Sequence, residues 1–282
     1  MTRVKTVLVV AVLIVVAAAV GGLVGAGAAI ALVKSSDNGP VNIERRSELT
    51  VHSDEFGESV LLRLHLPVEY AQEPNRRFPV VWVLDGPSQG TKVHRATQTL
   101  SRIGAAEPSI VVEVPRSGSG RTDDFTPPNE ASTRGGRADR FLRFLEREAI
   151  PSVEETFRAD TDRVLVGHSL GGLFALFALA ERPELFDAYF AFSPSVWVDD
   201  EEIIPLLQRA LPRERAGETF LYVSIGAQEG NEMAGGFDAV RETLETYAPP
   251  GLRWQMEITA GADHGSNPIL SYPVAASQYW RP

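Results

Sequence analysis

The sequence predicts an α/β fold in which a mostly parallel central sheet is covered by helices on both faces. Short apolar segments alternate along the chain with segments whose apolar residues recur at helical spacing. The segment Phe78–Leu84 is apolar almost throughout, which is typical of a strand buried on both faces of a sheet. The chain has 282 residues and 44% hydrophobic content, enough for one sizeable core, so we expect one such domain.

The N-terminus carries a long uncharged segment, Val7–Val33, preceded by Arg3 and Lys5. It exceeds the roughly 20 residues that cross a bilayer, and basic residues before it favour a cytoplasmic N-terminus. We expect residues 1–34 to be a transmembrane anchor with the bulk of the chain on the extracytoplasmic side. The alternative is a signal segment cleaved after small residues around 26–31, giving a secreted protein. Residues 35–46 are then a linker and residues 47–282 the main domain.

Composition restricts the partners. The net charge of −10 argues against nucleic acid, whose phosphates would be repelled. The chain has no cysteine, so it forms neither a disulfide nor a thiolate zinc site. The sequence gives no indication of the oligomeric state.

The elements of the main domain follow from local patterns. Two strands flank the turn Asp54–Gly57 as a hairpin would, and the later strands are short apolar runs that end at polar or glycine-containing turns. Apolar residues at helical spacing between 141 and 153 predict a helix just before the strand 163–167, and a strongly apolar helix follows Ser169 until Pro183 ends it. The predicted strands are 49–52, 60–66, 78–84, 110–114, 163–167, 189–192, 220–225 and 252–258. Only about twenty residues follow Trp197 before the next strand, fewer than a helical cap domain needs, so we expect no large cap and an open site.

A serine lies between glycines where a predicted strand passes into a predicted helix. The motif is Gly167-His168-Ser169-Leu170-Gly171, a nucleophile elbow in which the residues two before and two after the serine must be small. Ser169 is therefore the candidate nucleophile, and the N–H of Leu170 is a candidate oxyanion donor.

The second oxyanion donor is expected after the strand 78–84, in Asp85-Gly86-Pro87-Ser88. Pro87 has no N–H to donate, so Gly86 is favoured, with Ser88 as the next choice. A simple turn explains the same residues equally well.

The base and the acid follow from the order Ser, acid, His of the α/β-hydrolase fold. His52, His65 and His94 precede the serine, and His168 is its neighbour, with a side chain that should point elsewhere. His264, in a loop after the last strand, is then the candidate base. Glu229 is the favoured acid because it follows the strand ending at Ile225. Glu232 and Asp238 are rivals, and a Ser–His dyad without a firm acid is also open.

These motifs resemble the putative esterase family of α/β-hydrolases, the esterase D-like branch that includes the ferric-siderophore esterases. The resemblance runs from about Val51 to His264. It rests on Phe78–Gly86, Arg121 with Asp124–Pro127, Gly167–Leu173, Ser193–Trp197 and Asp263–Ser266. It implies Ser169 as nucleophile and His264 as base.

The resemblance also suggests that Arg121 and Trp197 line the substrate site. Arg121 would hold an anionic or catecholate-bearing substrate, although a salt bridge to Asp124 fits equally well. Trp197 would stack on an aromatic acyl group, or be an ordinary core tryptophan. Val198 stands where the family often has a second aromatic residue, so that wall is expected to differ.

The sequence thus predicts a serine carboxylic-ester hydrolase that works through an acyl-enzyme, without metal or organic cofactor, on a small-molecule ester. Bulky esters, such as siderophore or aromatic acyl esters, are the expected substrates. Two alternatives stay open at this point. One is an acyltransferase of the same fold, and the other is a membrane-tethered binding protein without catalytic activity.

Overall fold

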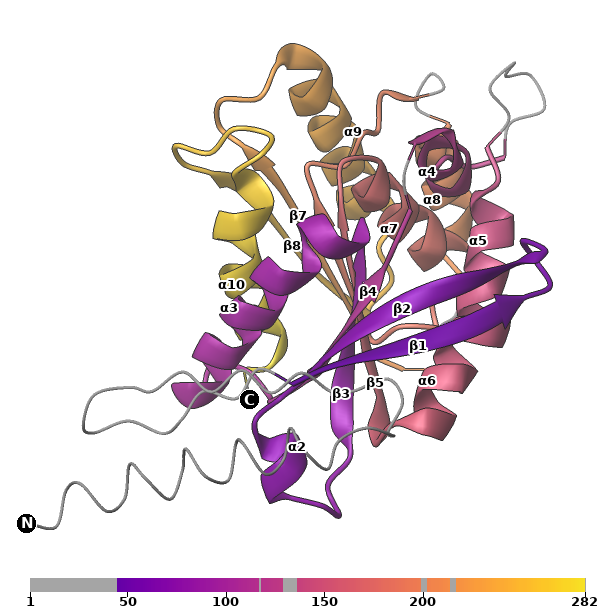
Figure 1. Cartoon of the computed structure of the whole chain (residues 1–282). Coiled ribbons are helices and arrows are strands. Elements are labelled where there is room, and N and C mark those ends of the chain that lie inside the picture. Colours follow the sequence, from indigo (N-terminus) through magenta and orange to yellow (C-terminus); the bar gives the residue numbers. More distant parts are fainter. Residues whose placement is uncertain (1–44, 117, 129–135, 199–201, 214–216, 282) are drawn as a thin grey trace, which may run out of the picture.

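Eight strands form one sheet in the computed structural model, which describes residues 45–116, 118–128, 136–198, 202–213 and 217–281 (Figure 1). Their order is β1-β2-β4-β3-β5-β6-β7-β8. Strands β3 to β8 are parallel to one another, whereas β2 pairs antiparallel with both β1 and β4. The strands are β1 (Arg45–Ser53), β2 (Glu58–Leu66), β3 (Phe78–Leu84), β4 (Ile110–Val114), β5 (Ala159–His168), β6 (Ala188–Phe192), β7 (Thr219–Gly226) and β8 (Leu252–Thr259). The predicted, mostly parallel α/β sheet is confirmed.

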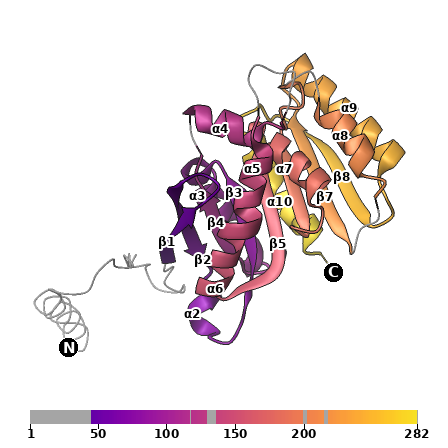
Figure 2. The same ribbon diagram turned by 90° about the vertical axis from the view of Figure 1, so that its right-hand side faces the viewer.

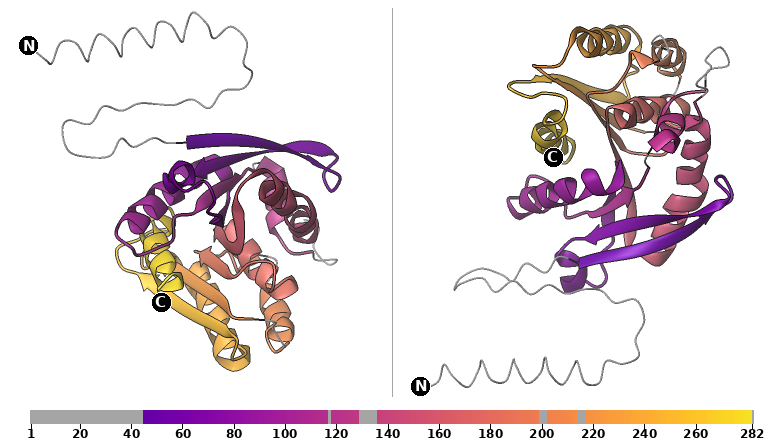
Figure 3. Two further views of the ribbon diagram at one scale, coloured as in Figure 1. Left: turned by 90° about the horizontal axis from the view of Figure 1, so that it is seen from below. Right: turned by 45° about the horizontal axis from the view of Figure 1, so that its top comes forward.

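Helices cover both faces of this sheet (Figure 3). Helices α3 and α10 pack together on one face, and α5 to α9 pack on the other. The helices are α2 (Glu69–Gln72), α3 (Gly90–Arg102), α4 (Gly118–Phe125), α5 (Ala138–Phe144), α6 (Ile150–Thr156), α7 (Leu170–Glu181), α8 (Ile203–Ala210), α9 (Asn231–Tyr247) and α10 (Asn267–Tyr279).

The central strand β3 shows why the sequence has this apolar pattern. Trp82 and Leu84 belong to the core under α5 to α9, whereas Val81 and Val83 belong to the core under α3 and α10. Successive side chains of a strand point to opposite faces, so a strand covered on both sides must be apolar at every position. All seven residues of β3 are buried.

The helix expected between 141 and 153 is interrupted. Between α5 and α6 lies a π-helical segment, Leu145–Ala149, in which the backbone hydrogen bonds span one residue more. Pro151, at the start of α6, has no N–H to donate to the preceding turn, which accounts for the change of register.

The parallel strands carry the functional loops to one edge. The turns after β3, β5, β6, β7 and β8 all leave the carboxyl ends of neighbouring strands, where α/β folds place their sites. Between β6 and β7 the helix among the described residues is α8, which packs against α7 and α9 at the side of the sheet (Figure 2). The described part of this connection therefore builds no cap over the edge.

The predicted N-terminal anchor, residues 1–34, lies outside the described residues, as does most of the linker. Within the described residues, none of the helices has the length and apolar character needed to cross a bilayer. The division at residues 34 and 46 stays a prediction.

Candidate active site

Ser169 occupies a strained turn between β5 and α7. Its φ of 60° and ψ of −121° are rare for a residue with a side chain. Its N–H donates to the backbone oxygen of Phe192, 3.0 Å away at the end of β6. A Cβ on Gly167 would lie 1.9 Å from the backbone oxygen of Gly171, so only glycine fits at 167. The chain therefore bends sharply enough to project the serine from the sheet edge.

After the serine, the close approach occurs at Gly172 and not at Gly171. We expected the second residue after Ser169 to be constrained, but a Cβ on Gly171 would make an ordinary contact, 3.4 Å from the Asp85 carboxylate. A Cβ on Gly172 would come within 3.0 Å of the Pro194 Cα. The reason is that the loop after β6 packs on the third residue of the turn.

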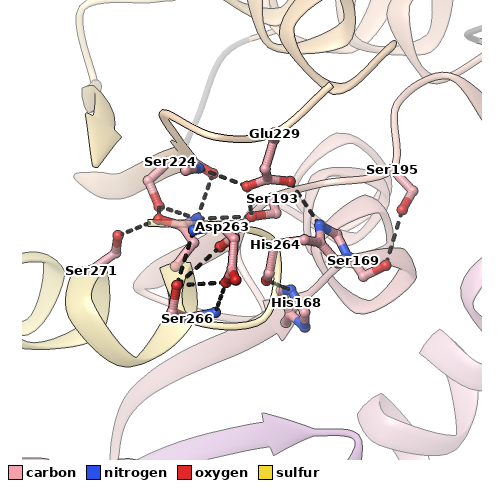
Figure 4. A network of polar contacts seen from close by, with 12 residues as sticks. His168, Ser169, Ser193, Ser195, Ser224, Glu229, Asp263, His264, Ser266 and Ser271 are labelled. Atoms are coloured by element: carbon pink, nitrogen blue, oxygen red, sulfur yellow. Dashed lines mark hydrogen bonds and ion pairs between the residues drawn. The ribbon is translucent and has the colours of Figure 1, made fainter. Parts of the chain in front are cut away.

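His264 is hydrogen-bonded to Glu229 at the same edge (Figure 4). Nδ1 of His264 lies 2.7 Å from Oε2 of Glu229. The Glu229 side chain is 1% exposed, whereas that of His264 is 45% exposed. The other carboxylate oxygen accepts hydrogen bonds of 2.6 Å from the Ser193 hydroxyl and from the Gly226 N–H. The carboxylate is thus fixed on both oxygens and faces the imidazole.

The two rival acids, Glu232 and Asp238, lie on α9. Asp238 forms an exposed ion pair with Arg241 on α9, with 2.6 Å between Oδ1 and the guanidinium. Glu232 lies in the first turn of α9 and lines the cleft beside the serine. Of the three candidate carboxylates, Glu229 is the one hydrogen-bonded to the His264 ring.

A buried polar network holds Ser193 behind the carboxylate (Figure 4). The amide of Asn267, the first residue of α10, donates to Ser193 Oγ at 2.8 Å and to the Ser224 backbone oxygen at 3.2 Å. Ser271 donates to the Asn267 amide oxygen at 2.8 Å. Sequence reasoning missed this network. The one available signal was that Ser193 begins the motif Ser193–Trp197, on which the family resemblance partly rests.

His168 also belongs to the site, which sequence reasoning did not anticipate. Its Nε2 lies 2.8 Å from the backbone oxygen of His264, and the two ring centroids are 4.6 Å apart. A carbonyl oxygen only accepts, so Nε2 carries the proton. Burial lowers the pKa of His168 to about 4, with the nearby His264 adding to the effect, so the ring is neutral at pH 7. The His168 side chain therefore contacts the loop that carries His264.

Ser169 and His264 line the same cleft, with the His264 ring drawn between Glu229 and Ser169 in Figure 4. Among the described residues, the side-chain hydrogen bond of Ser169 Oγ is with Ser195 Oγ, at 3.2 Å. The serine hydroxyl and the imidazole therefore lie at the same edge of the sheet and face one cleft.

The cleft is open and partly apolar. It encloses about 660 Å³ and its lining includes Trp197 and Met233. Trp197 is 46% exposed, so it is not a core tryptophan. It is available to contact a bound molecule with its indole face.

Arg121 makes its ion pair with Asp85, so the expected pair with Asp124 is wrong. One edge of the guanidinium, Nε and Nη2, donates to both oxygens of the Asp85 carboxylate, with 2.8 Å for the Nη2 contact, and Nη2 also donates to the His168 backbone oxygen at 3.4 Å. Asp124 instead pairs with Arg116, 3.0 Å away. Arg121 thus ties the loop after β3 to the residue before Ser169, because β3 and β5 are neighbours in the sheet.

The two expected oxyanion donors flank the elbow. Leu170 is the first residue of α7, where a helix leaves its N–H groups unpaired. Gly86 opens a short 3₁₀ turn after β3 with φ of 42°, and a Cβ there would lie 2.9 Å from the Pro115 Cα. Their distances to a bound carbonyl stay a prediction.

Metal-binding side chains do not gather in the part of the chain that the structure describes. No group of three or more histidine and carboxylate side chains there is placed to hold a metal ion. The ring nitrogens Nδ1 of His264 and Nε2 of His168 are engaged with protein oxygens.

Comparison with known proteins adds the family. The model of the family described as "Putative esterase" matches residues 53–246. Ferri-bacillibactin esterase BesA of Bacillus subtilis is 31% identical over 234 residues, which cover 74% of this chain and 79% of the relative. The chain belongs to this esterase family. It is a carboxylic ester hydrolase.

Two further relatives extend the comparison. Siderophore triacetylfusarinine C esterase of Aspergillus fumigatus is 30% identical over 171 residues, which cover 56% of this chain and 58% of the relative, so the match spans less than two thirds of that relative's length. The crystal structure of BES protein from Bacillus cereus superposes with a TM-score of 0.77 at 24% identity, covering 89% of this chain and 100% of that one. The structural similarity supports the α/β-hydrolase fold.

The family match and the site overlap only in part. Ser169 and Glu229 lie inside the matched residues of this esterase, whereas His264 lies beyond residue 246. The position of His264 beside Glu229 therefore comes from the structure itself.

Proposed function

We propose that this esterase is a serine hydrolase in which Ser169 attacks the ester, His264 transfers the proton and Glu229 orients and stabilises His264. One observation carries the proposal: the buried Glu229 carboxylate holds Nδ1 of His264, and the ring lies beside Ser169 at the strained turn (Figure 4). A nucleophile, a base and a group that orients the base are the parts that acyl transfer requires.

In the acylation step, Ser169 Oγ turns from Ser195 toward His264 and attacks the ester carbonyl. Nε2 of His264 takes the serine proton, and the charge that develops on the ring is stabilised by Glu229. The hydrogen bonds from Ser193 and Gly226 keep the carboxylate in place.

The N–H groups of Leu170 and Gly86 are proposed to stabilise the oxyanion, with the N-terminus of α7 adding its partial positive charge. His264 then returns the proton to the leaving alcohol, and the acyl group stays on Ser169. In the second half, His264 takes a proton from the water that attacks the acyl carbon and returns it to Ser169 Oγ as the serine leaves, so the carboxylic acid is released and both side chains are regenerated.

A fluorophosphonate probe tests the assignment of the nucleophile and the base. The wild-type protein should label covalently, and Ser169→Ala and His264→Ala should not. His52→Ala is the matched control, because the His52 side chain is 74% exposed and lies on β1, far from Ser169 and His264 in the sequence. Labelling of Ser169→Ala at the wild-type rate would refute the proposal.

Bulky esters of the siderophore type are the proposed substrates. Relatives named as siderophore esterases support this, as does an open cleft of about 660 Å³ beside Ser169. The test compares kcat/KM over short nitrophenyl esters, feruloyl esters and ferric tri-ester siderophores. A clear preference for the large esters supports the proposal, and activity confined to acetate esters contradicts it.

We also propose that residues 1–34 anchor or export the protein, so that this domain acts outside the cytoplasm. The uncharged segment Val7–Val33 after Arg3 and Lys5 supports the proposal. Fractionation of cells that express the full chain tests this proposal. A protein found only in the cytosol would contradict both the anchored and the exported alternative.

A further inference from the structure

The cleft beside Ser169 carries carboxylates and no cations among its described residues. Its lining includes the acidic side chains of Glu229, Glu232 and Asp263, and neither lysine nor arginine contributes to the described lining. Asp263 accepts hydrogen bonds from the Ser266 hydroxyl and backbone N–H, which lower its pKa and keep it ionised. A molecule in this cleft therefore meets negative charge.

The arginine expected to offset this charge is already paired. Arg121 uses the Nε and Nη2 edge of its guanidinium on the Asp85 carboxylate, and Nη2 donates in addition to the backbone of His168. For Arg121 to bind a substrate anion, it would have to leave a bidentate pair whose carboxylate is only 11% exposed. Such a pair is costly to break, because a largely buried carboxylate would lose two hydrogen bonds from a cation.

One feature of the cleft favours anions, and it is offset. The cleft includes the first turn of α9, where Asn231 and its neighbours present helical N–H groups. Glu232 occupies that same turn, so its carboxylate cancels the partial positive charge. Glu229 lines the same cleft and adds a second carboxylate beside the first turn of α9.

We propose that this cleft selects uncharged esters over anionic ones, an inference that rests on the proposed esterase function. Among ferric siderophore esters, three hydroxamates neutralise the charge of the iron, whereas three catecholates leave a trianion. The cleft should therefore accept tri-ester hydroxamate chelates and disfavour catecholate chelates. This reverses the expectation from sequence that Arg121 holds a catecholate-bearing substrate.

Two chromogenic esters of equal chain length test the selection directly. Nitrophenyl pentanoate is uncharged, and the nitrophenyl half-ester of glutaric acid ends in a carboxylate. We expect kcat/KM at low ionic strength to favour the pentanoate by about tenfold or more, since two or three nearby carboxylates repel the anion. The ratio should fall toward one in about 1 M salt, where charges more than a few Å apart are screened.

Glu232→Gln shows whether the selection arises in the cleft. This variant should reduce the pentanoate-to-glutarate ratio about threefold, because one of the repelling charges is gone. Glu242→Gln is the matched control: it removes the same charge from an exposed position on α9 that does not line the cleft. The control should keep the wild-type ratio.

The outcomes separate this inference from the function on which it rests. Equal rates on both esters, or faster hydrolysis of the glutarate, would overturn the charge selection while leaving the esterase intact. A ratio that falls equally in both variants would also overturn it, because the effect would then come from net charge. If neither ester is hydrolysed and the fluorophosphonate probe does not label, the proposed function itself fails.

Discussion

The His168 ring donates a hydrogen bond from Nε2 to the backbone oxygen of His264, 2.8 Å away. His168 precedes the proposed nucleophile directly, and His264 carries the proposed base. One contact therefore links the turn after β5 with the turn after β8, two segments that no strand pairing joins. The two rings also pack against each other, with centroids 4.6 Å apart.

Loss of this hydrogen bond should slow catalysis without weakening substrate binding. His168→Phe keeps a ring in the same place but cannot donate, so the loop of His264 loses its tie to the elbow. We expect kcat to fall about tenfold or more with KM nearly unchanged, since small displacements of a base are costly. His168→Gln, whose amide donates at a similar reach, should recover most of the rate of fluorophosphonate labelling. A role in packing alone would give the reverse order, with Phe better tolerated than Gln.

The charge of Glu229 should matter more than its shape. Glu229→Gln keeps the size of the side chain but removes the charge that stabilises protonated His264, so kcat/KM should fall about a thousandfold or more. Asp238→Asn is the matched control, because Asp238 is exposed on α9 and pairs with Arg241. Steady-state kinetics of the two purified variants distinguish the acids. Similar losses in both would contradict the assignment.

Gly226 should be needed for the His264 loop to sit close to β7. A Cβ at this position would lie 2.5 Å from the backbone oxygen of Ala262, two residues before His264. Gly226→Ala should therefore move the loop and lower kcat/KM about a hundredfold, while circular dichroism still shows a folded protein.

The control for that variant is Gly235→Ala. A Cβ on Gly235, in α9, would meet no heavy atom within 4 Å, so the substitution should keep the activity and raise stability by about 0.5–1 kcal/mol. Full activity of Gly226→Ala would show that catalysis does not depend on the close approach of Gly226 to the backbone of Ala262.

Acid should destabilise the fold through two buried histidines. Burial lowers the pKa of His94 to about 3, with the charges of His65, Arg46 and Arg95 adding to the effect, and burial lowers the pKa of His168 to about 4. Both are near 6.5 in the unfolded chain, so below that pH the unfolded state binds more protons. Their contribution to stability is complete above about pH 6.5 and is lost as the pH falls toward 4, by up to about 1.4 kcal/mol per pH unit for each ring.

Thermal unfolding between pH 7 and 4 measures this effect. His94→Leu should flatten the fall of Tm with pH, because neither ring nitrogen of His94 has a hydrogen-bond partner among the described residues that leucine would forfeit. His52→Leu replaces an exposed histidine and should keep the wild-type slope. An unchanged slope for His94→Leu would contradict the assignment.

Much of the fold was predictable because the signals are local. The alternation of apolar strands and amphipathic helices reflects which faces are covered, and β3 had to be apolar throughout once both faces were buried. Ser169 and His264 became the candidate nucleophile and base because a glycine-flanked turn and the order of residues along the chain narrow the choice, and the structure brings both to one cleft. The interruption of the helix before β5 was missed, although Pro151 was its visible cause.

The partners of the charged groups were not predictable from sequence. Three carboxylates were candidates for the acid, and only the packing of α10 and the turn after β7 shows that Glu229 contacts His264. For Arg121 the alternative to substrate binding was an ion pair with Asp124, three residues away, but the neighbouring positions of β3 and β5 bring Asp85 to it instead. His168 was set aside as the neighbour of the serine, yet the turn after β8 lies on its ring.

By itself the sequence determined the layers of this esterase and named Ser169 and His264 as the candidate nucleophile and base, because each inference depends on local backbone conformation, apolar spacing or order along the chain. The tertiary structure alone decided which candidate carboxylate contacts His264, which ion pairs form and which buried hydrogen bonds surround the site. Those contacts join strand ends that are far apart in the chain, and their geometry is set by how the sheet brings the loops together.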